Sequence, residues 1–426
     1  MTVLATAPLR RGTCPGLSAP MPTGDGLLVR LYPTGTISLA AFAALCAAAR
    51  RHGNGVIEVT SRGSIQVRGL SERSAPDFAA DIAALDIAAA DGVPVLADVL
   101  SGIGAEEMFD AGALAADLRR ALAQRAISTR LSPKVSVAID GGGAIGLAAV
   151  AADIRLGAQA RDGNVALHIA VGGDESRAAP VGTVALSDGV RTAVRLLDVI
   201  AQRGREQRAR NIVAAEGASV FRSAISDLLI SDPVLDSRLR GNGRKMVSPI
   251  GAHALRDGSL ACGIGLAFGH SDATVLEQLA DAASDAGASG FRAAASRTFT
   301  TIGLTAEAAP DFVIAANKLG FITRADDPRR RVIACAGAPV CASAHIASRA
   351  LAPRIAKEAE CTIHISGCAK GCAHAGPVAL TIVGPADGCA LIGNGSARDA
   401  PFAVVPTGEL PAAIAAFAKK REAGHV

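Results

Sequence analysis

The sequence contains an internal repeat, and this repeat constrains the fold more than any other feature. Four blocks recur in the same order in the two halves of the 426-residue chain. They are GDGLL (24–28) and GIGLAF (263–268), Ser-Arg at 61–62 and 296–297, APDF at 75–78 and 309–312, and VSVAIDGG (135–142) and CTIHISGC (361–368). The alternative is chance similarity produced by the Gly, Ala and Val content. Because the order is kept, we predict two copies of one unit, related by a pseudo-twofold axis, with ligand sites between them.

Each copy has the pattern of a mixed α and β unit. Residues 26–32 alternate apolar and polar side chains as a half-buried strand does. Ser38 stands where it would cap a following amphipathic helix. The expected elements of the first copy are a strand at 26–32, a helix from Ser38 to His52, strands near 56–60 and 65–68, and a helix from Pro76. Helix-like stretches at 187–203 and 408–422 close the two copies.

Composition excludes several classes of protein. The net charge of +4 is too dilute for a nucleic-acid-binding surface, and 3% aromatic residues leave few rings for base stacking. No apolar run approaches the roughly 20 residues needed to span a bilayer. Nine cysteines without an export signal indicate a reducing compartment, where clustered thiols bind metal or do redox chemistry. We expect a soluble, cytoplasmic protein that binds neither nucleic acid nor membrane.

Four cysteines form the chemical centre of the sequence. Cys335 and Cys341 bracket five residues, and Cys368 and Cys372 bracket three. Four soft thiolates brought together by two short segments suit an iron–sulfur cluster. Glycines within and beside these segments let the backbone wrap closely. A zinc site that also uses nearby histidines remains an alternative, although structural zinc usually uses shorter spacings between its ligands. The histidines concerned are His345, His364 and His374.

The two cysteine pairs, the duplication and two basic blocks together resemble the sulfite and nitrite reductase superfamily. The blocks are VTSRGSIQVRG (59–69) and LSPKVSVAID (131–140). The resemblance implies a 4Fe-4S cluster held by all four cysteines, with Cys372 bridging to sirohaem iron in the reductases. It also implies an α+β, internally duplicated fold with pseudo-twofold symmetry, made of ferredoxin-like half-domains and two larger α/β lobes.

The chain departs from the reductases at their anion cage of two Arg and two Lys. Arg62 matches the first Arg and Lys134 the first Lys, but Ser136 replaces the second Lys. The stretch 92–101, where the second Arg is expected, has no basic residue. Because reduction of sulfite or nitrite needs positive charge around the bound anion, this loss argues against that reaction. A sirohaem-dependent reductase remains the first alternative.

Two features resemble the precorrin-3B synthase family. They are the N-terminal segment RRGTCPGLSAPMPTGDGLLVRL (10–31) and the short gap between the cysteine pairs. This implies an oxygen-dependent monooxygenase that converts precorrin-3A to precorrin-3B in aerobic cobalamin biosynthesis, by meso-carbon hydroxylation and lactone formation. It further implies NAD(P)H as electron source and a mononuclear non-haem iron whose ligands no motif identifies. A non-catalytic tetrapyrrole-binding electron-transfer protein is the alternative from another class.

Basic residues on or beside the predicted strands give the acidic macrocycle a binding surface. Arg is suited to the bidentate binding of acetate and propionate carboxylates. The candidates for substrate binding are Arg30, Arg62, Arg68, Lys134 and Arg297, of which Arg62 and Lys134 are also the candidates for catalysis. The alternative is that such residues form a solvated face. The glycine-rich DGGGAIG (140–146) lacks the dinucleotide fingerprint, so we expect electrons to arrive through a partner reductase.

These observations divide the chain into six segments. They are an N-terminal arm (1–23), a first ferredoxin-like half-domain (24–95), a first α+β lobe (96–203), a basic linker (204–255), a second ferredoxin-like half-domain (256–325) and an iron–sulfur lobe (326–426).

Overall fold

The computed structural model describes the chain between residues 15 and 422, apart from 126, 162, 232–246 and 375. Most of the predicted N-terminal arm, with Cys14, lies outside the described residues. The basic run 236–245 of the predicted linker lies outside them as well.

The first half forms a five-stranded sheet with two helices. The strand order is β1 (Met21–Thr23), β2 (Gly26–Leu31), β5 (Ile65–Leu70), β4 (Val56–Val59) and β14 (His270–Asp272). The helices are α1 (Leu39–His52) and α2 (Ser74–Ala83). Helix α1 begins where the sequence predicts, because the Ser38 side chain accepts a hydrogen bond from the backbone of Ala41.

The second half repeats this sheet strand for strand. Its order is β12 (Gly251–Ala254), β13 (Leu260–Gly265), β16 (Thr298–Leu304), β15 (Gly290–Ala294) and β3 (Ile37–Ser38). Its helices are α7 (Ala273–Asp285) and α8 (Ala309–Lys318). The duplicated α+β fold predicted from the repeat is therefore confirmed by the strand orders.

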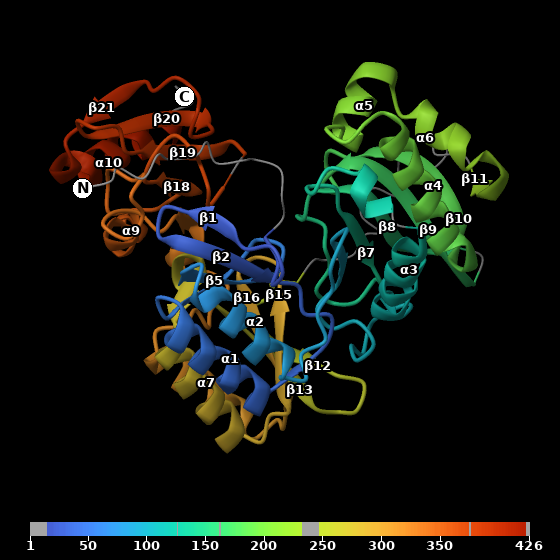
Figure 1. Cartoon of the computed structure of the whole chain (residues 1–426), viewed down its shortest axis with the longest axis horizontal. Coiled ribbons are helices and arrows are strands. Elements are labelled where there is room, and N and C mark those ends of the chain that lie inside the picture. Colours follow the sequence, from blue (N-terminus) through green and yellow to red (C-terminus); the bar gives the residue numbers. More distant parts are fainter. Residues whose placement is uncertain (1–14, 126, 162, 232–246, 375, 423–426) are drawn as a thin grey trace.

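The two halves exchange their shortest strands. Strand β3 of the first half pairs with β15, and β14 of the second half pairs with β4. Helices α1 and α7, which follow the exchanged strands, pack against each other beneath the sheets (Figure 1). Phe42 of α1 contacts Phe291 and Phe299 of the second half, with ring centroids 4.6 and 5.1 Å apart. One hydrophobic core therefore serves both halves.

Each half continues into a lobe; in Figure 1 the first lobe lies to the upper right of the paired sheets and the second to their upper left. The first lobe has the strand order β11 (Leu229–Ser231), β10 (Ala179–Ala185), β9 (Asn164–Gly173), β8 (Ala152–Arg161), β7 (Val137–Asp140) and β6 (Val95–Ala97). The second has β17 (Val332–Ala334), β18 (Ile363–Ser366), β19 (Val378–Val383), β20 (Cys389–Gly395) and β21 (Ala403–Val405). In both lobes the first three strands in chain order are parallel and the next is antiparallel.

Helices cover the lobe sheets in corresponding places. Those of the first lobe are α3 (Ala111–Arg125), α4 (Gly189–Gln202), α5 (Ala209–Glu216) and α6 (Ser219–Ala224). Those of the second lobe are α9 (Ser348–Ala356) and α10 (Leu410–Glu422). Helices α3 and α9 each lie between the first two parallel strands in sequence, whereas α4 and α10 close the copies near the predicted ranges 187–203 and 408–422.

The predicted basic linker, 204–255, is more than a connector. It contains α5, α6 and β11, which belong to the first lobe, and β12, the edge strand of the second sheet. Ile212, Phe221 and Ile225 are buried in the lobe core and hold this segment in place. Because the segment is rich in charged residues, these few buried apolar residues were not recognised in the sequence. The other segment boundaries stay predictions.

None of the helices in the part of the chain that the structure describes has the length and apolar character needed to cross a membrane.

Candidate functional site

The four predicted cluster cysteines lie at one edge of the second lobe. Cys335 directly follows β17, and Cys368 lies two residues beyond the end of β18. These strands are parallel neighbours, so their carboxyl ends meet at the same edge of the sheet. The backbone N–H of Gly367 donates to the Cys335 thiol at 3.1 Å, which joins the two cysteine segments.

The four thiols lie close enough to influence one another's charge. Burial, and then the charges of the Cys335 and Cys368 thiols, raise the pKa of Cys372, while Arg68 lowers it and Cys341 raises it further. Thiolates must form before they bind iron, and a bound cationic cluster offsets the repulsion between them. The Cys372 thiol therefore lies near the other three, as four ligands of one cluster must.

The arrangement does not favour a single metal ion. Across the described residues, no three His, Cys, Asp or Glu side chains are gathered closely enough to hold one ion. A structural zinc needs four ligands within about 2.0–2.3 Å of one point, whereas a 4Fe-4S cluster places each thiolate on its own iron. The cysteine set therefore fits the cluster better than the zinc alternative. For the same reason we assign no ligands to a mononuclear iron.

Close backbone packing surrounds the cysteine loops, as the glycines predict. A Cβ atom on Gly367 would lie 2.5 Å from the Cβ of Ala344. A Cβ on Gly337 would lie 2.4 Å from the backbone nitrogen of Ser348. Real Cβ atoms do not approach other atoms so closely. A side chain on Gly367 would displace the segment that follows Cys341, and one on Gly337 would displace the first cysteine loop from the start of α9.

A hairpin of the first half covers the cysteine loops of the second lobe. The Ala342 N–H donates to the Gly24 carbonyl at 3.0 Å, in the turn between β1 and β2. The next residue, Asp25, is bound bidentately by Arg68 at 2.6 and 2.7 Å. Arg68 also approaches Glu58, which accepts a hydrogen bond from Arg349 of the second lobe. Charged pairs therefore join the first half to the cluster lobe.

Two histidines lie beside the cysteine loops. The rings of His364 and His374 are 5.9 Å apart, and His364 is fully buried. Neither ring nitrogen of His364 has a hydrogen-bond partner among the described residues. Burial, and then the positive charges of His374 and Arg297, lower the pKa of His364 to about 4, so its ring is neutral at pH 7. His345 instead donates its backbone N–H to Gly367 in the loop itself.

The two repeated Ser-Arg turns meet at the pseudo-twofold axis. Arg62 and Ala295 form an isolated β-bridge, and the Ser296 N–H donates to the Ser61 carbonyl at 3.1 Å. The guanidinium groups then diverge towards different lobes. Arg62 donates to the Ala151 carbonyl in the first lobe at 3.0 Å, and Arg297 donates to the Ala373 carbonyl in the second at 3.5 Å. The structure thus places these two predicted substrate ligands apart.

Arg62 adjoins the block that carries Lys134. Burial lowers the pKa of Arg62, as does the neighbouring Arg208, and Asp153 opposes this. Asp153 is held by Arg208 and accepts the backbone N–H of Ser136 at 3.0 Å. The Ser136 hydroxyl, which replaces the reductases' second Lys, is fully buried without a hydrogen-bond partner in the described part of the chain. Lys134, two residues earlier, is exposed.

Arg30 and Arg68 lie on neighbouring strands of the first sheet, β2 and β5. Arg30 donates to the Tyr32 hydroxyl at 3.2 Å. The charges of both residues act on the pKa of Arg62, which Arg30 lowers and Tyr32 raises. Arg68 is already committed to Asp25, as described above, and it lies close enough to Cys372 for their charges to interact. Arg30 therefore lies near Arg62, whereas Arg68 lies near Cys372.

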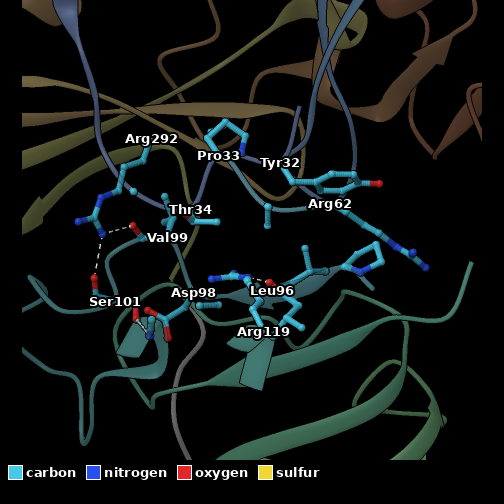
Figure 2. Close-up of a pocket in the computed structure, with 18 of the residues that line it drawn as sticks. Tyr32, Pro33, Thr34, Arg62, Leu96, Asp98, Val99, Ser101, Arg119 and Arg292 are labelled. Atoms are coloured by element: carbon cyan, nitrogen blue, oxygen red, sulfur yellow. Dashed lines mark hydrogen bonds between the residues drawn. The ribbon is translucent and has the colours of Figure 1, made fainter. Parts of the chain in front are cut away.

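Sequence reasoning missed two arginines in a cavity that Arg62 also lines. Figure 2 shows this cavity, of about 120 Å³, with Tyr32 and Arg62 on one side and Arg119 and Arg292 on others. Arg119 from α3 donates to the Val95 carbonyl at 2.7 Å, and Arg292 from β15 donates to the Val99 and Ser101 carbonyls at 3.0 and 2.8 Å. Both reach the stretch 92–101, which carries no basic residue of its own. No local motif marks either arginine.

Comparison with known proteins first defines the class. Residues 19–85 match the model of the nitrite/sulfite reductase ferredoxin-like half domain. The NirA protein of Mycobacterium tuberculosis has a similar structure, with a TM-score of 0.73 over 91% of this chain and 79% of that chain. At 18% identity this likeness concerns the fold alone. The predicted sulfite/nitrite reductase-like fold is therefore confirmed.

A relative of closer sequence defines the family within that class. A precorrin-3B synthase from Sinorhizobium sp is 38% identical over 416 residues, which cover 96% of this chain and 88% of the relative. The chain belongs to the precorrin-3B synthase family.

Proposed function

We propose that the protein is an oxygen-dependent monooxygenase that converts precorrin-3A to precorrin-3B in aerobic cobalamin biosynthesis. The observation that carries the proposal is the near full-length similarity to a precorrin-3B synthase. The altered anion cage supports it, because Ser136 and the stretch 92–101 supply no cation where the reductases need one. Oxygen and electrons derived from NAD(P)H, delivered by a partner reductase, complete the proposed reaction.

Cys335, Cys341, Cys368 and Cys372 would hold a 4Fe-4S cluster, which supplies one-electron transfer when bound. The rest of the chain would shield this cluster from solvent. The Gly24–Asp25 turn covers Cys341, and the buried Asp25–Arg68 pair anchors that turn. Arg68 also brings positive charge close to Cys372, which favours its thiolate form.

Arg62 and Lys134 would bind carboxylates of the macrocycle from the side of the first lobe. A guanidinium is a bidentate partner for a carboxylate, and Arg62 is fixed by its contact with the Ala151 carbonyl. Arg30 continues the positive surface towards Arg68 and the cysteines. The proposed role of these residues is to orient the macrocycle over the cluster face, with Arg62 and Lys134 nearest the reacting carbon.

The test is turnover of precorrin-3A by the reconstituted full-length protein with dioxygen and a chemical or enzymatic reductant. We expect precorrin-3B to form only when both are present, with one atom of labelled dioxygen incorporated into the product. Reduction of sulfite or nitrite at a comparable rate would overturn the proposal in favour of the reductase. A reducible cluster without any turnover would favour the electron-transfer protein.

A further inference from the structure

A second cavity lies where the second half of the molecule meets the first lobe. It has a volume of about 390 Å³ and lies between the Ser296–Arg297 turn, the segment before β17 and the first lobe. Its cationic lining consists of Arg297, Arg329, Arg330 and Arg331. A cavity of this size accommodates a small molecule.

The acidic residues of this cavity are already paired. Asp326 binds Arg324 at 2.7 Å, and Asp327 binds Arg329 at 2.6 Å. Among the described residues, no carboxylate lies within ion-pairing distance of Arg297, Arg330 or Arg331. Arg330 and Arg331 are exposed, so they would attract an anion to the mouth of the cavity.

Arg297 lies deeper than Arg330 and Arg331, whose guanidinium groups donate to the Ala325 and Ala359 carbonyls and form no ion pair among the described residues. Its hydrogen-bond partner in the described part of the chain is the Ala373 carbonyl, at the long distance of 3.5 Å. Burial lowers its pKa, and the charge of Glu58 offsets this only in part. A guanidinium has five N–H donors, so the half-buried Arg297 has donors available to a ligand.

The backbone that carries Arg297 is strained. Phe268, Ser296 and Arg297 have φ angles of 61°, 65° and 63°, in the left-handed region that side chains rarely adopt. All three line the cavity. In the corresponding turn of the first half, the left-handed residue is Gly63, for which this conformation is easy. The strain is therefore particular to the second half, and such strain concentrates at functional sites.

The position of the cavity follows from the internal duplication. The first-half cavity of Figure 2 is lined by Arg62 and the segment that leads into β6. The second-half cavity is lined by Arg297 and the segment that leads into β17. Strands β6 and β17 occupy corresponding places in the two lobes. The two cavities are thus pseudo-symmetric counterparts that have acquired different linings.

We propose that the second-half cavity is a separate binding site for a small oxyanion ligand, bearing carboxylate or phosphate groups, that Arg297 binds from inside and Arg330 and Arg331 bind from the mouth. Arg297 lines this cavity, whereas the Arg62 guanidinium donates to the Ala151 carbonyl.

Calorimetric titration of the full-length protein with inorganic pyrophosphate and, separately, with malonate tests this. We expect one of the probes to bind with a dissociation constant below about 1 mM. The R330Q/R331Q double variant should weaken binding at least tenfold, and R297Q should do the same. The control is the R51Q/R120Q double variant, which removes equal charge from exposed positions elsewhere.

The two probes identify the ligand group, because stronger binding of pyrophosphate indicates a phosphate and stronger binding of malonate a carboxylate. Absence of binding by both probes would overturn the proposal. Binding that the R330Q/R331Q variant leaves unchanged, or that the R51Q/R120Q control weakens equally, would also overturn it. Since the double variant alters exposed side chains, its effect does not depend on the folding of R297Q.

Discussion

Individual charged residues link the first half of the molecule to the proposed cluster. Arg68 binds Asp25 and lies near Cys372, so one guanidinium both fixes the covering turn and lowers the cost of a thiolate. The Asp25 side chain is 2% exposed, which makes the pair a buried one. Breaking such a pair leaves an uncompensated buried charge and costs about 3–5 kcal/mol. Asp25 and Arg68 would therefore support the proposed cluster without binding it.

Cys372→Ala should abolish assembly of the intact cluster. The remaining three thiols leave one iron without its protein ligand, so we expect substoichiometric iron and sulfide in the purified variant. Iron and acid-labile sulfide analysis provides the measurement. Cys361→Ala is the matched control, because Cys361 lies in the same lobe outside the two cysteine pairs. A full complement of iron and sulfide in Cys372→Ala would show that Cys372 is not a ligand.

Arg62→Ala should weaken macrocycle binding while leaving the cluster intact. Loss of a hydrogen bond to a charged group costs about 1.5–3 kcal/mol, which corresponds to roughly 10–100-fold in the dissociation constant. Equilibrium titration with precorrin-3A, followed by absorption, measures it. Arg120→Ala, on the exposed face of α3, serves as control. Unchanged affinity in Arg62→Ala would remove Arg62 from the site.

Only some of the site residues could be identified from the sequence. Arg62 and the four cysteines belong to local motifs, so their proximity to a site could be predicted. Arg119 and Arg292 could not, because one comes from a helix of the first lobe and the other from a strand of the second half. Their shared cavity exists only after the sheets have packed. For Arg297 the sequence indicated a ligand role but not the separate cavity in which it lies.

Among the elements, the exchanged strands β3 and β14 have the greatest consequence. The sequence predicted the helices that follow them, since Ser38 and the apolar face of 39–52 are local signals. It gave no indication of the exchange, because strands of two or three residues carry too little pattern to specify a partner. His270 begins β14 and pairs with Glu58 of β4.

The burial of His270, at the start of β14, should make stability depend on pH. Burial, and then the charge of Arg349, lower the pKa of His270 to about 4, from an ordinary value near 6.5. The unfolded chain therefore binds more protons between these values, and stability falls as the pH decreases from about 6.5 to 4. We expect a smaller fall in His270→Gln, measured as the thermal midpoint at pH 7 and pH 5. His364 has a similar shift, so part of the fall should remain.

An equal pH dependence in the wild type and His270→Gln would show that His270 is protonated as easily in the folded protein as in the unfolded chain. His52→Gln is a suitable control, because the His52 ring donates a hydrogen bond to the half-exposed Asp81 and lies on α1 outside the exchanged strand.

At the scale of the whole molecule, the exchange makes the two halves mutually dependent. A fragment ending at residue 231 lacks β14, and a fragment beginning at residue 247 lacks β3. Each fragment also exposes its part of the shared core around Phe42 and Phe291. We expect the separate fragments to aggregate and the co-expressed fragments to purify together as a soluble complex, assayed by affinity capture through one tagged fragment. A soluble, folded single fragment would contradict this dependence.

The duplication itself was predictable from the sequence, because the repeated blocks fall on corresponding elements. Ser61–Arg62 and Ser296–Arg297 turned out to be the contact between the copies, and the blocks 135–142 and 361–368 contain β7 and β18. The structured part of 204–255 was not predictable, because its buried apolar residues are few and widely spaced. The repeated sequence blocks therefore identified the two duplicated units, but they did not predict the structure of the segment that connects them.

The most direct test of the central claim is the composition of the anaerobically purified protein. Iron, sulfide and extractable tetrapyrrole should be quantified together with absorption and EPR spectra, before and after addition of precorrin-3A. We predict a reducible four-iron cluster without sirohaem, whose spectrum changes when the macrocycle binds. Stoichiometric, tightly bound sirohaem in the protein as purified would contradict the proposed function and make the chain a reductase.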